Sequence, residues 1–502
     1  MKRLGFDELI ASTRSRERDL VLGMVAARLI EPDSKLATTR WWHTTTLPAE
    51  LGVADADEDD LYDAMDWLLK RQPSIEKKLA ARHLKEGGLV LFDLTSSYFE
   101  GVTCPLAAHN RDGKKGKLQV NWGLLSDDRG RPVAVSVFKG NTGDPKTLMP
   151  QVRKVKEDFG IEAMVMVGDR GMITQTQIDE IKGLDGVDWI TALKTEGIKT
   201  LVEGGALQME LFDERNLFEM THPDYPGERL VACLNPELRK LRGHKRRSLL
   251  EATSRELEKV RSMVERGKLK GKGPDEIGVR VGKVVNNYKV AKHFVLDIQE
   301  SRFDFHIDEK KVEAEAALDG IYVIRTSLDE KRSSAEDAVR HYKKLVLIEQ
   351  AYRSLKTIDL QTRPIRHHTE DRVRAHIFLC MPACYVEWYM REAWRSLLFC
   401  DEDQEAKKTR DPVAPAKRSE AALNKVHSKV LDRRDRGPQL PDLAQAAQRR
   451  RAQRLPRAEG GPRRAHLRGC HHPEREATTS LRSSGGHRSV GRTAKSTSGR
   501  SS

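Results

Sequence analysis

Residues 89–101 read LVLFDLTSSYFEG, an apolar run that reaches an aspartate at position 93 and then becomes polar. A run of Leu, Val and Phe is typical of a buried strand, whereas a buried carboxylate is costly unless a partner compensates its charge. We therefore predict a central strand of a sheet, ending at Asp93, whose carboxylate has a specific partner.

The chain that follows alternates between strand and helix patterns. Residues 120–141 contain two apolar runs joined by the turn residues SDDRGRP, which predicts a hairpin. Asp144, followed by proline, begins a helix; a buried strand at 163–169, a helix starting at Thr174 and a strand at 189–193 follow. The order β-β-β-α-β-α-β is that of the ribonuclease H-like fold, so we predict an α/β protein with a mixed sheet flanked by helices.

Changes of pattern divide the chain into five segments. Residues 1–88 carry two amphipathic helical patterns and are interpreted as a helical N-terminal domain, a candidate for binding DNA ends. Residues 89–195 are predicted to form the first part of the ribonuclease H-like core, and 320–400 its second part. Between them, residues 196–319 combine short strands with a long basic helix and are predicted to be a β-containing insertion domain. Residues 401–502 are a basic tail.

Most of the net charge of +14 lies in this tail. Residues 431–502 carry 17 Lys and Arg against 6 Asp and Glu, a net +11, and they contain no Ile, Phe, Trp, Tyr or Met. Such a composition cannot bury enough apolar surface to offset its chain entropy, so disorder is the direct interpretation. A nonspecific DNA-binding arm and a frameshift product are the alternatives.

Cysteine usage and hydropathy exclude several other classes of protein. The longest apolar stretch, residues 376–390, is too short to span a bilayer, and the N-terminus lacks a signal-peptide core, which predicts cytoplasmic residence. The six cysteines form no C-x-x-C pair, so neither a disulfide framework nor a zinc ribbon is indicated. His376, Cys380 and Cys384 have apolar neighbours and predict a packed helix face.

Three acidic residues stand where a ribonuclease H-like sheet would bring them together. Asp93 ends the first strand and Asp169 ends the fourth, its neighbour in such a sheet. Two buried carboxylates repel each other, and a divalent cation such as Mg²⁺ removes the conflict. The third ligand is expected from the helix at 341–357, where a stripe about 60° wide holds an acid, two cations and an aromatic. These residues are Glu349, Arg353, Lys356 and Tyr342.

Each candidate also has an ordinary structural interpretation. An aspartate at a strand end is usually a turn residue or a cap, and a helical Glu beside cations is usually part of a solvated ion-pair stripe. Arg40 precedes a Trp pair that suits either DNA contact or a helical core. The basic run Lys245, Arg246 and Arg247 suits phosphate contact or a solvated helix. The three acids together, in the right element order, favour a metal site.

At these residues the chain resembles bacterial insertion-sequence DDE transposases, in particular the branch with the signature Y-x2-R-x3-E-x6-K. Tyr342, Glu349 and Lys356 occupy three of its four positions, and Leu345 stands where the signature has Arg, next to Lys344. DLTSSYFEG, GNTGDPKTL, GDRGM and RPIRHHTEDRVRAHIFLC are similar to motifs of the same family. The resemblance covers about residues 1–430.

The resemblance implies a cut-and-paste transposase that cleaves at terminal inverted repeats and joins the freed 3′-hydroxyl to target DNA. Asp93, Asp169 and Glu349 would be its catalytic residues and would hold two Mg²⁺ or Mn²⁺ ions. Tyr342 and Lys356 would contact DNA near the cut, and Arg353, Lys245, Arg246, Arg247 and Arg40 are further candidates for DNA binding. The implied partners are double-stranded DNA and a second copy of the chain. The implied location is the bacterial cytoplasm, at the nucleoid, and no membrane partner is implied. A nuclease without strand transfer and an inactive DNA-binding relic are the alternatives.

Overall fold

The computed structural model describes residues 1–109, 116–268, 273–300 and 302–395, with isolated positions between 413 and 424. All described elements belong to one unit of the chain, Met1–Gln453. The tail at 431–502 lies outside the described residues, so its disorder stays a prediction. In the described part of the chain, no helix is both long enough and apolar enough to cross a membrane.

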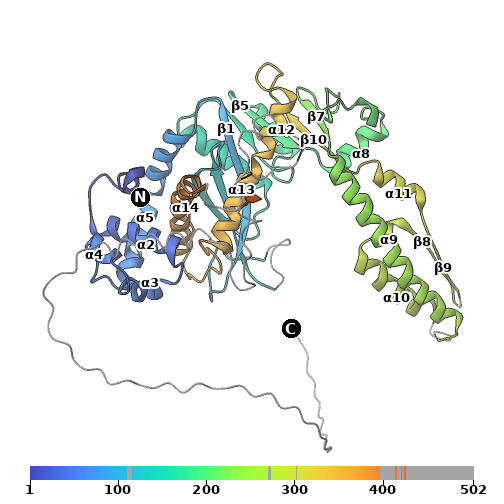
Figure 1. Cartoon of the computed structure of the whole chain (residues 1–502), viewed down its shortest axis with the longest axis horizontal. Helices are drawn as coiled ribbons and strands as arrows, with labels where there is room; N and C mark the ends of the chain where they lie inside the picture. Colours follow the sequence, from blue (N-terminus) through green and yellow to red (C-terminus); the bar gives the residue numbers. More distant parts are fainter. Residues whose placement is uncertain are drawn as a thin grey trace, which may run out of the picture. The chain divides into compact units, whose positions relative to one another are not determined.

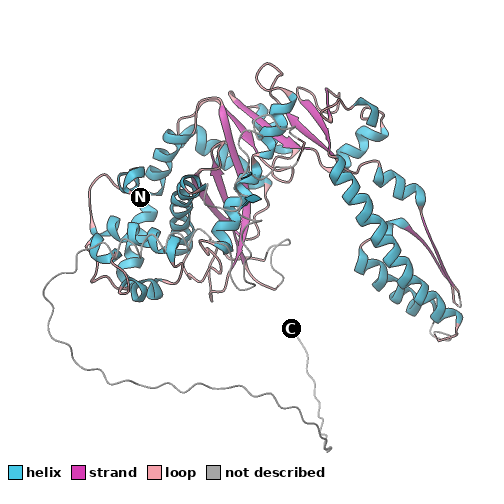
Figure 2. Cartoon of the chain, viewed as in Figure 1, coloured by secondary structure: helices cyan, strands magenta, loops and turns pink. Residues whose placement is uncertain are grey.

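The central element is an eight-stranded sheet in the order β3-β2-β1-β4-β5-β10-β7-β6 (Figures 1 and 2). Its strands are β1 (Gly88–Tyr98), β2 (Gln119–Ser126), β3 (Pro132–Lys139), β4 (Met164–Val167), β5 (Val187–Ala192), β6 (Leu217–Met220), β7 (Arg229–Leu234) and β10 (Ile321–Thr326). The first three strands pair antiparallel, and β1, β4 and β5 pair parallel. This mixed sheet with flanking helices is the predicted ribonuclease H-like arrangement, and the predicted element order is confirmed.

The helices between these strands follow local sequence signals. Helix α6 (Pro145–Arg153) begins after Asp144 and buries Leu148 and Val152, as its apolar period predicts. It continues as a π-helical turn, Lys154–Asp158. Helix α7 (Gln175–Lys182) lies between β4 and β5, and α8 (Thr195–Glu203) follows β5. Elsewhere in the described chain, short 3₁₀ turns lie at Lys2–Leu4, Met209–Leu211 and Ala291–His293.

Five N-terminal helices share a hydrophobic core with the sheet. They are α1 (Phe6–Ile10), α2 (Arg16–Ile30), α3 (Lys35–Trp42), α4 (Leu47–Leu51) and α5 (Glu58–His83). Helix α14 (Glu370–Ala393) packs against α2, α5 and β3, as Figure 1 shows for the two helices. Trp42 is 2% exposed, which identifies it as a core residue. Residues 1–88 therefore pack on the sheet and its helices through one continuous apolar cluster.

The predicted insertion contains two kinds of structure. Strands β6 and β7 extend the central sheet beyond β10. The following elements are α9 (Pro236–Glu265), α10 (Gly273–Tyr288), the hairpin β8 (Phe294–Ile298) and β9 (Phe303–Ile307), and α11 (Glu309–Ala316). They enclose a separate apolar cluster built around Leu257, Ile277 and Phe303. The part with its own core is therefore narrower than residues 196–319.

Two short helices and a π-helical turn follow β10. They are α12 (Ala335–Lys343), α13 (Leu345–Arg353) and the turn Ser354–Ile358. Helix α12 begins after Ser334, whose hydroxyl accepts the Asp337 N–H at 3.1 Å and so caps the helix.

A buried carboxylate fastens α5 to the edge of the sheet. Glu76 is 0% exposed, accepts the Val135 N–H of β3 at 3.0 Å and pairs with Lys154 at 2.5 Å. Burial raises the pKa of Glu76, while the Lys154 ammonium acts in the opposite direction. The side chain is therefore compensated on both oxygens, as a buried acid must be.

We expect Glu76→Ala to lower the free energy of unfolding by about 3–5 kcal/mol, because it leaves Lys154 without its partner and the Val135 N–H without an acceptor. Urea denaturation followed by circular dichroism measures the change. Lys77→Ala, at the adjacent exposed position of α5, is the control and should cost less than about 0.5 kcal/mol. Equal losses for the two variants would show that Glu76 does not stabilise the fold.

Candidate active site

Asp93 lies in the middle of β1. The strand continues five residues beyond it to Tyr98, because DLTSSY pairs with β2 in a register that sets Asp93 opposite Leu124. The prediction that the first strand ends at Asp93 is therefore wrong. What ends near Asp93 is the parallel pairing with β4, whose last pair is Leu91 with Val167. Asp93 lies two residues beyond this last pair.

Asp169 lies at the corresponding position after β4. It too comes two residues beyond the Leu91–Val167 pair, at the carboxyl end of a parallel neighbour of β1. Asp169 is exposed, and its carboxylate accepts the Gly171 N–H and the Tyr342 hydroxyl, each at 3.3 Å. The sheet therefore places the two aspartates side by side, as the element order predicts.

Glu349 is exposed on α13, which packs against β1. Burial raises the pKa of Asp93 to about 7; the Leu94 N–H opposes this shift, and the charges of Asp169, Glu349 and Asp144 add to it. The structure therefore brings Asp93, Asp169 and Glu349 within electrostatic reach of one another. Asp144, at the start of α6, is a fourth nearby acid that the sequence analysis assigned only to helix capping.

The other three residues of the predicted stripe differ in their burial and in their contacts with the acids. Tyr342 bonds Asp169, and burial followed by the Asp169 charge raises the pKa of its hydroxyl. Lys356 is half-buried in the π-helical turn; burial lowers its pKa to about 8, and Arg363 adds to this while Asp93 opposes it. Arg353 is exposed at the end of α13. Tyr342 thus contacts one acid of the site, and Lys356 lies near enough to Asp93 for its pKa to respond to that charge.

The donor set fits a hard divalent cation by its chemistry. Carboxylate oxygens, completed by water and substrate phosphate, are what Mg²⁺ takes in proteins, and a cation would favour the ionised form of Asp93. In the described part of the chain, however, no three His, Cys, Asp or Glu side chains are grouped closely enough to hold a metal ion. The carboxylates are neighbours, and they would have to converge further to share an ion.

The remaining basic candidates are divided between surface and structure. Arg40, Lys245 and Arg247 are exposed. Arg246 instead donates from Nη2 to both carboxylate oxygens of Asp319, each at 2.6 Å, and its side chain is only 10% exposed. Arg246 therefore joins α9 to the loop before β10, and only its neighbours remain open to a phosphate.

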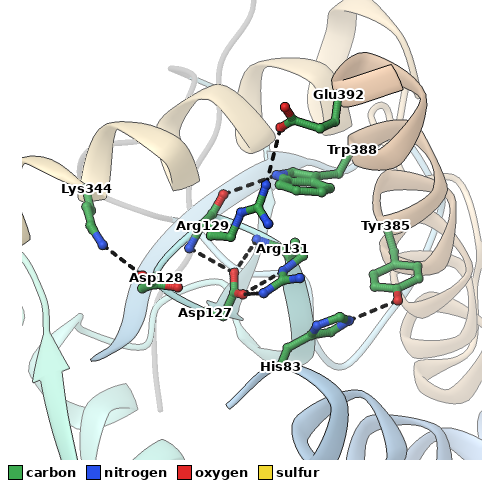
Figure 3. Close-up of polar contacts among 9 residues, drawn as sticks. All are labelled: His83, Asp127, Asp128, Arg129, Arg131, Lys344, Tyr385, Trp388 and Glu392. Atoms are coloured by element: carbon green, nitrogen blue, oxygen red, sulfur yellow. Dashed lines mark hydrogen bonds and ion pairs between the residues drawn. The ribbon is translucent and has the colours of Figure 1, made fainter. Parts of the chain in front are cut away.

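The turn between β2 and β3 is a part of the site that the sequence analysis missed. The Asp127 carboxylate accepts the backbone N–H groups of Arg129 at 3.0 Å and Arg131 at 2.8 Å, which closes the turn (Figure 3). Asp128 pairs with Lys344 at the start of α13 at 2.9 Å. Lys344 lies beside Leu345, the position where the family signature has Arg. That departure from the signature was the only feature of the sequence that pointed to Lys344.

The same turn also contacts α14. The Trp388 indole N–H donates to the Arg129 carbonyl at 3.1 Å, and the Arg129 guanidinium lies 5.0 Å from the Trp388 ring centroid (Figure 3). Gly130, with φ +77°, lies so close to α13 that an added Cβ would meet the Leu347 Cβ at 2.7 Å. The turn is thus packed between the N-terminal end of the Glu349 helix and α14.

Comparison with known proteins gives one family. The sequence matches the family described as Transposase DDE domain over residues 87–385, a range that includes all three acids. No curated protein matches the sequence. Among solved structures, the cryo-EM piggyBac transposase synaptic complex with hairpin DNA aligns with a TM-score of 0.36 and 9% identity, over 89% of this chain and 76% of that one. A likeness this low supports no conclusion by itself.

We expect Gly130→Ala to destabilise the protein by about 2–4 kcal/mol, because it combines a left-handed backbone with a clash against Leu347. Gly227→Ala is the matched control, since Gly227 has φ +74° and no atom within 4 Å of an added Cβ. It should cost only about 1–2 kcal/mol. Chemical denaturation measures both variants, and equal losses would contradict the close packing of α13 on the turn.

Proposed function

Because the chain belongs to the DDE transposase domain family, and so is a DNA phosphoryl-transfer enzyme, we propose that it moves an insertion sequence by cutting and pasting. In this proposal it cleaves DNA at the terminal inverted repeats of its element and joins the freed 3′-hydroxyl to target DNA. Tyr342, Glu349 and Lys356, at three of the four positions of the Y-x2-R-x3-E-x6-K signature, favour the insertion-sequence branch.

The main support is that two acids from separate elements lie near the half-buried carboxyl group of Asp93. Asp93 on β1 experiences the negative charges of Asp169, after β4, and of Glu349, on α13. Acids that serve only as caps or as solvated ion pairs have no reason to come together in this way, because their repulsion costs free energy. A functional site compensates that cost with a cationic partner.

Enzymes of this family use divalent metal ions, and we assign Asp93, Asp169 and Glu349 as the ligands of two Mg²⁺ or Mn²⁺ ions. Bound there, such ions would activate the attacking hydroxyl and stabilise the leaving oxygen. The protein's own groups prepare the site. Tyr342 donates a hydrogen bond to Asp169 and orients its carboxylate. Sheet pairing fixes the backbone that carries Asp93.

DNA contact is assigned to one lysine near this site and to exposed cations on three helices. Lys356 carries a positive charge next to Asp93, where it would attract a phosphate oxygen. Arg353 on α13, Lys245 and Arg247 on α9, and Arg40 on α3 are exposed and free to follow the DNA backbone. A second copy of the chain is proposed as the partner, because a cut-and-paste reaction brings two element ends together.

We expect Asp93→Asn, Asp169→Asn and Glu349→Gln each to reduce cleavage by about 10³-fold or more, since electrostatic stabilisation dominates catalysis of phosphoryl transfer. The assay incubates the full chain with DNA fragments carrying the element's own ends and Mg²⁺, and measures nicked product. Binding to the same fragments, measured by gel shift, should persist in all three variants.

Glu180→Gln, an exposed position of α7, is the matched control and should retain wild-type cleavage. A supercoiled target plasmid is included so that strand-transfer products can be counted. Cleavage without joined product would favour a nuclease, and end binding without cleavage by the wild type would favour an inactive relic. Equal cleavage by the wild type and the three variants would reject the assigned site.

A further inference from the structure

The hydroxyl of Tyr352 lies between the backbones of β1 and β2 at the position of Asp93. It donates to the carbonyl oxygen of Asp93 on β1 and accepts the N–H of Leu124 on β2 at 3.0 Å. Asp93 and Leu124 are register partners in the antiparallel pairing of these strands. A side chain from α13 therefore takes part in the pairing of β1 with β2 at the residue that carries the first acid.

The position of Tyr352 on α13 ties this contact to Glu349. Residues three apart on an α-helix are neighbours on its surface, so Tyr352 lies one turn from Glu349. Tyr352 is 6% exposed and belongs to the buried side of the helix with Ile348 and Leu355. The hydrogen bond from Tyr352 to the Asp93 backbone therefore sets the position of α13 along β1 and the rotation of α13 about its axis. Both determine where Glu349 lies.

The ring of Tyr352 lies in a rigid socket. Trp122 of β2 meets it edge to face, with ring centroids 5.1 Å apart and an angle of 89°. The Trp122 indole N–H donates to the Ser97 hydroxyl of β1 at 3.0 Å, which orients the indole. The Lys356 ammonium lies 5.6 Å from the Tyr352 ring centroid. The same tyrosine thus contacts the strand with Asp93 and supports the lysine assigned to DNA.

We infer that Tyr352 is a positioning residue for the phosphoryl-transfer reaction, whose hydroxyl holds the Glu349 helix in register with Asp93. It does not touch the reacting atoms and acts through the placement of the two carboxylates. The sharing of metal ions by acids on separate elements depends on their spacing, so a small shift of α13 is expected to affect the reaction more than the fold. The inference deepens the proposed function and rests on it for its effect on rate.

The test uses Tyr352→Phe in the full chain, which removes one oxygen atom and keeps the ring in its socket. Cleavage of element-end DNA should show a kcat about 10- to 100-fold lower than wild type, with an unchanged KM for DNA. Tyr385→Phe is the matched control, because it too removes a hydrogen-bonded hydroxyl from a buried tyrosine. Tyr385 belongs to α14, and its hydroxyl bonds the His83 side chain at 2.9 Å. The control variant should retain wild-type kcat. A wild-type kcat in Tyr352→Phe, or an equal loss in both variants, would overturn the inference.

A second measurement separates this inference from the proposed function. Hydrogen–deuterium exchange of the protein without DNA should be faster in Tyr352→Phe, but not in Tyr385→Phe, for the peptide that contains β2 and the peptide that contains β1. If the wild type does not cleave, the proposed function fails while faster exchange still supports the fastening of α13. Unchanged exchange in Tyr352→Phe would overturn the fastening itself.

Discussion

Asp93 is half-buried near two other carboxylates, and this partial burial together with their charges raises its pKa to about 7. Negatively charged carboxylates repel each other more strongly where little water screens them, so the rest of the fold has to hold these acids near one another. Parallel pairing of β1 with β4 does this for Asp93 and Asp169 by placing each two residues beyond the same backbone pair. Glu349 comes from a separate helix, and its placement depends on how that helix is attached.

Helix α13 is attached at both ends by different means. At its start Leu347 packs on Gly130, and Lys344 pairs with Asp128. That ion pair is half-exposed and is worth under about 1 kcal/mol, so packing on the turn is the stronger restraint. At its other end the Tyr352 hydroxyl bonds two backbone groups of the sheet. The turn is also packed against α14. The position of Glu349 therefore depends on the strand pair β1–β2, on the turn after β2 and on α14, which are distant from one another or from α13 in sequence.

The basic residues have several roles, and their charge alone does not separate them. Arg246 is committed to Asp319 and shapes the junction of α9 with the core, whereas Lys245 and Arg247 beside it are exposed. Exposed cations attract DNA over several ångströms and lose this effect in salt. A buried cation that is already paired contributes to the arrangement of the fold. Of these three residues, Arg246 therefore serves the fold, whereas Lys245 and Arg247 remain candidates for DNA contact.

The sequence by itself determined the order of the first strands and helices and the ribonuclease H-like class, because hydrophobic period, caps and turn residues are local signals. It also supplied the three acids as candidates for a metal site, which stays a prediction. It did not determine where β1 ends, since the pairing with β2 carries the strand past Asp93 to Tyr98. Nor could it distinguish Arg246 from its neighbours or separate Tyr352 from other buried aromatic residues. Those roles depend on Asp319 and on the Asp93–Leu124 pair, which lie far away along the chain. Only the tertiary structure brings such partners together, because hydrogen bonds and packing act through space.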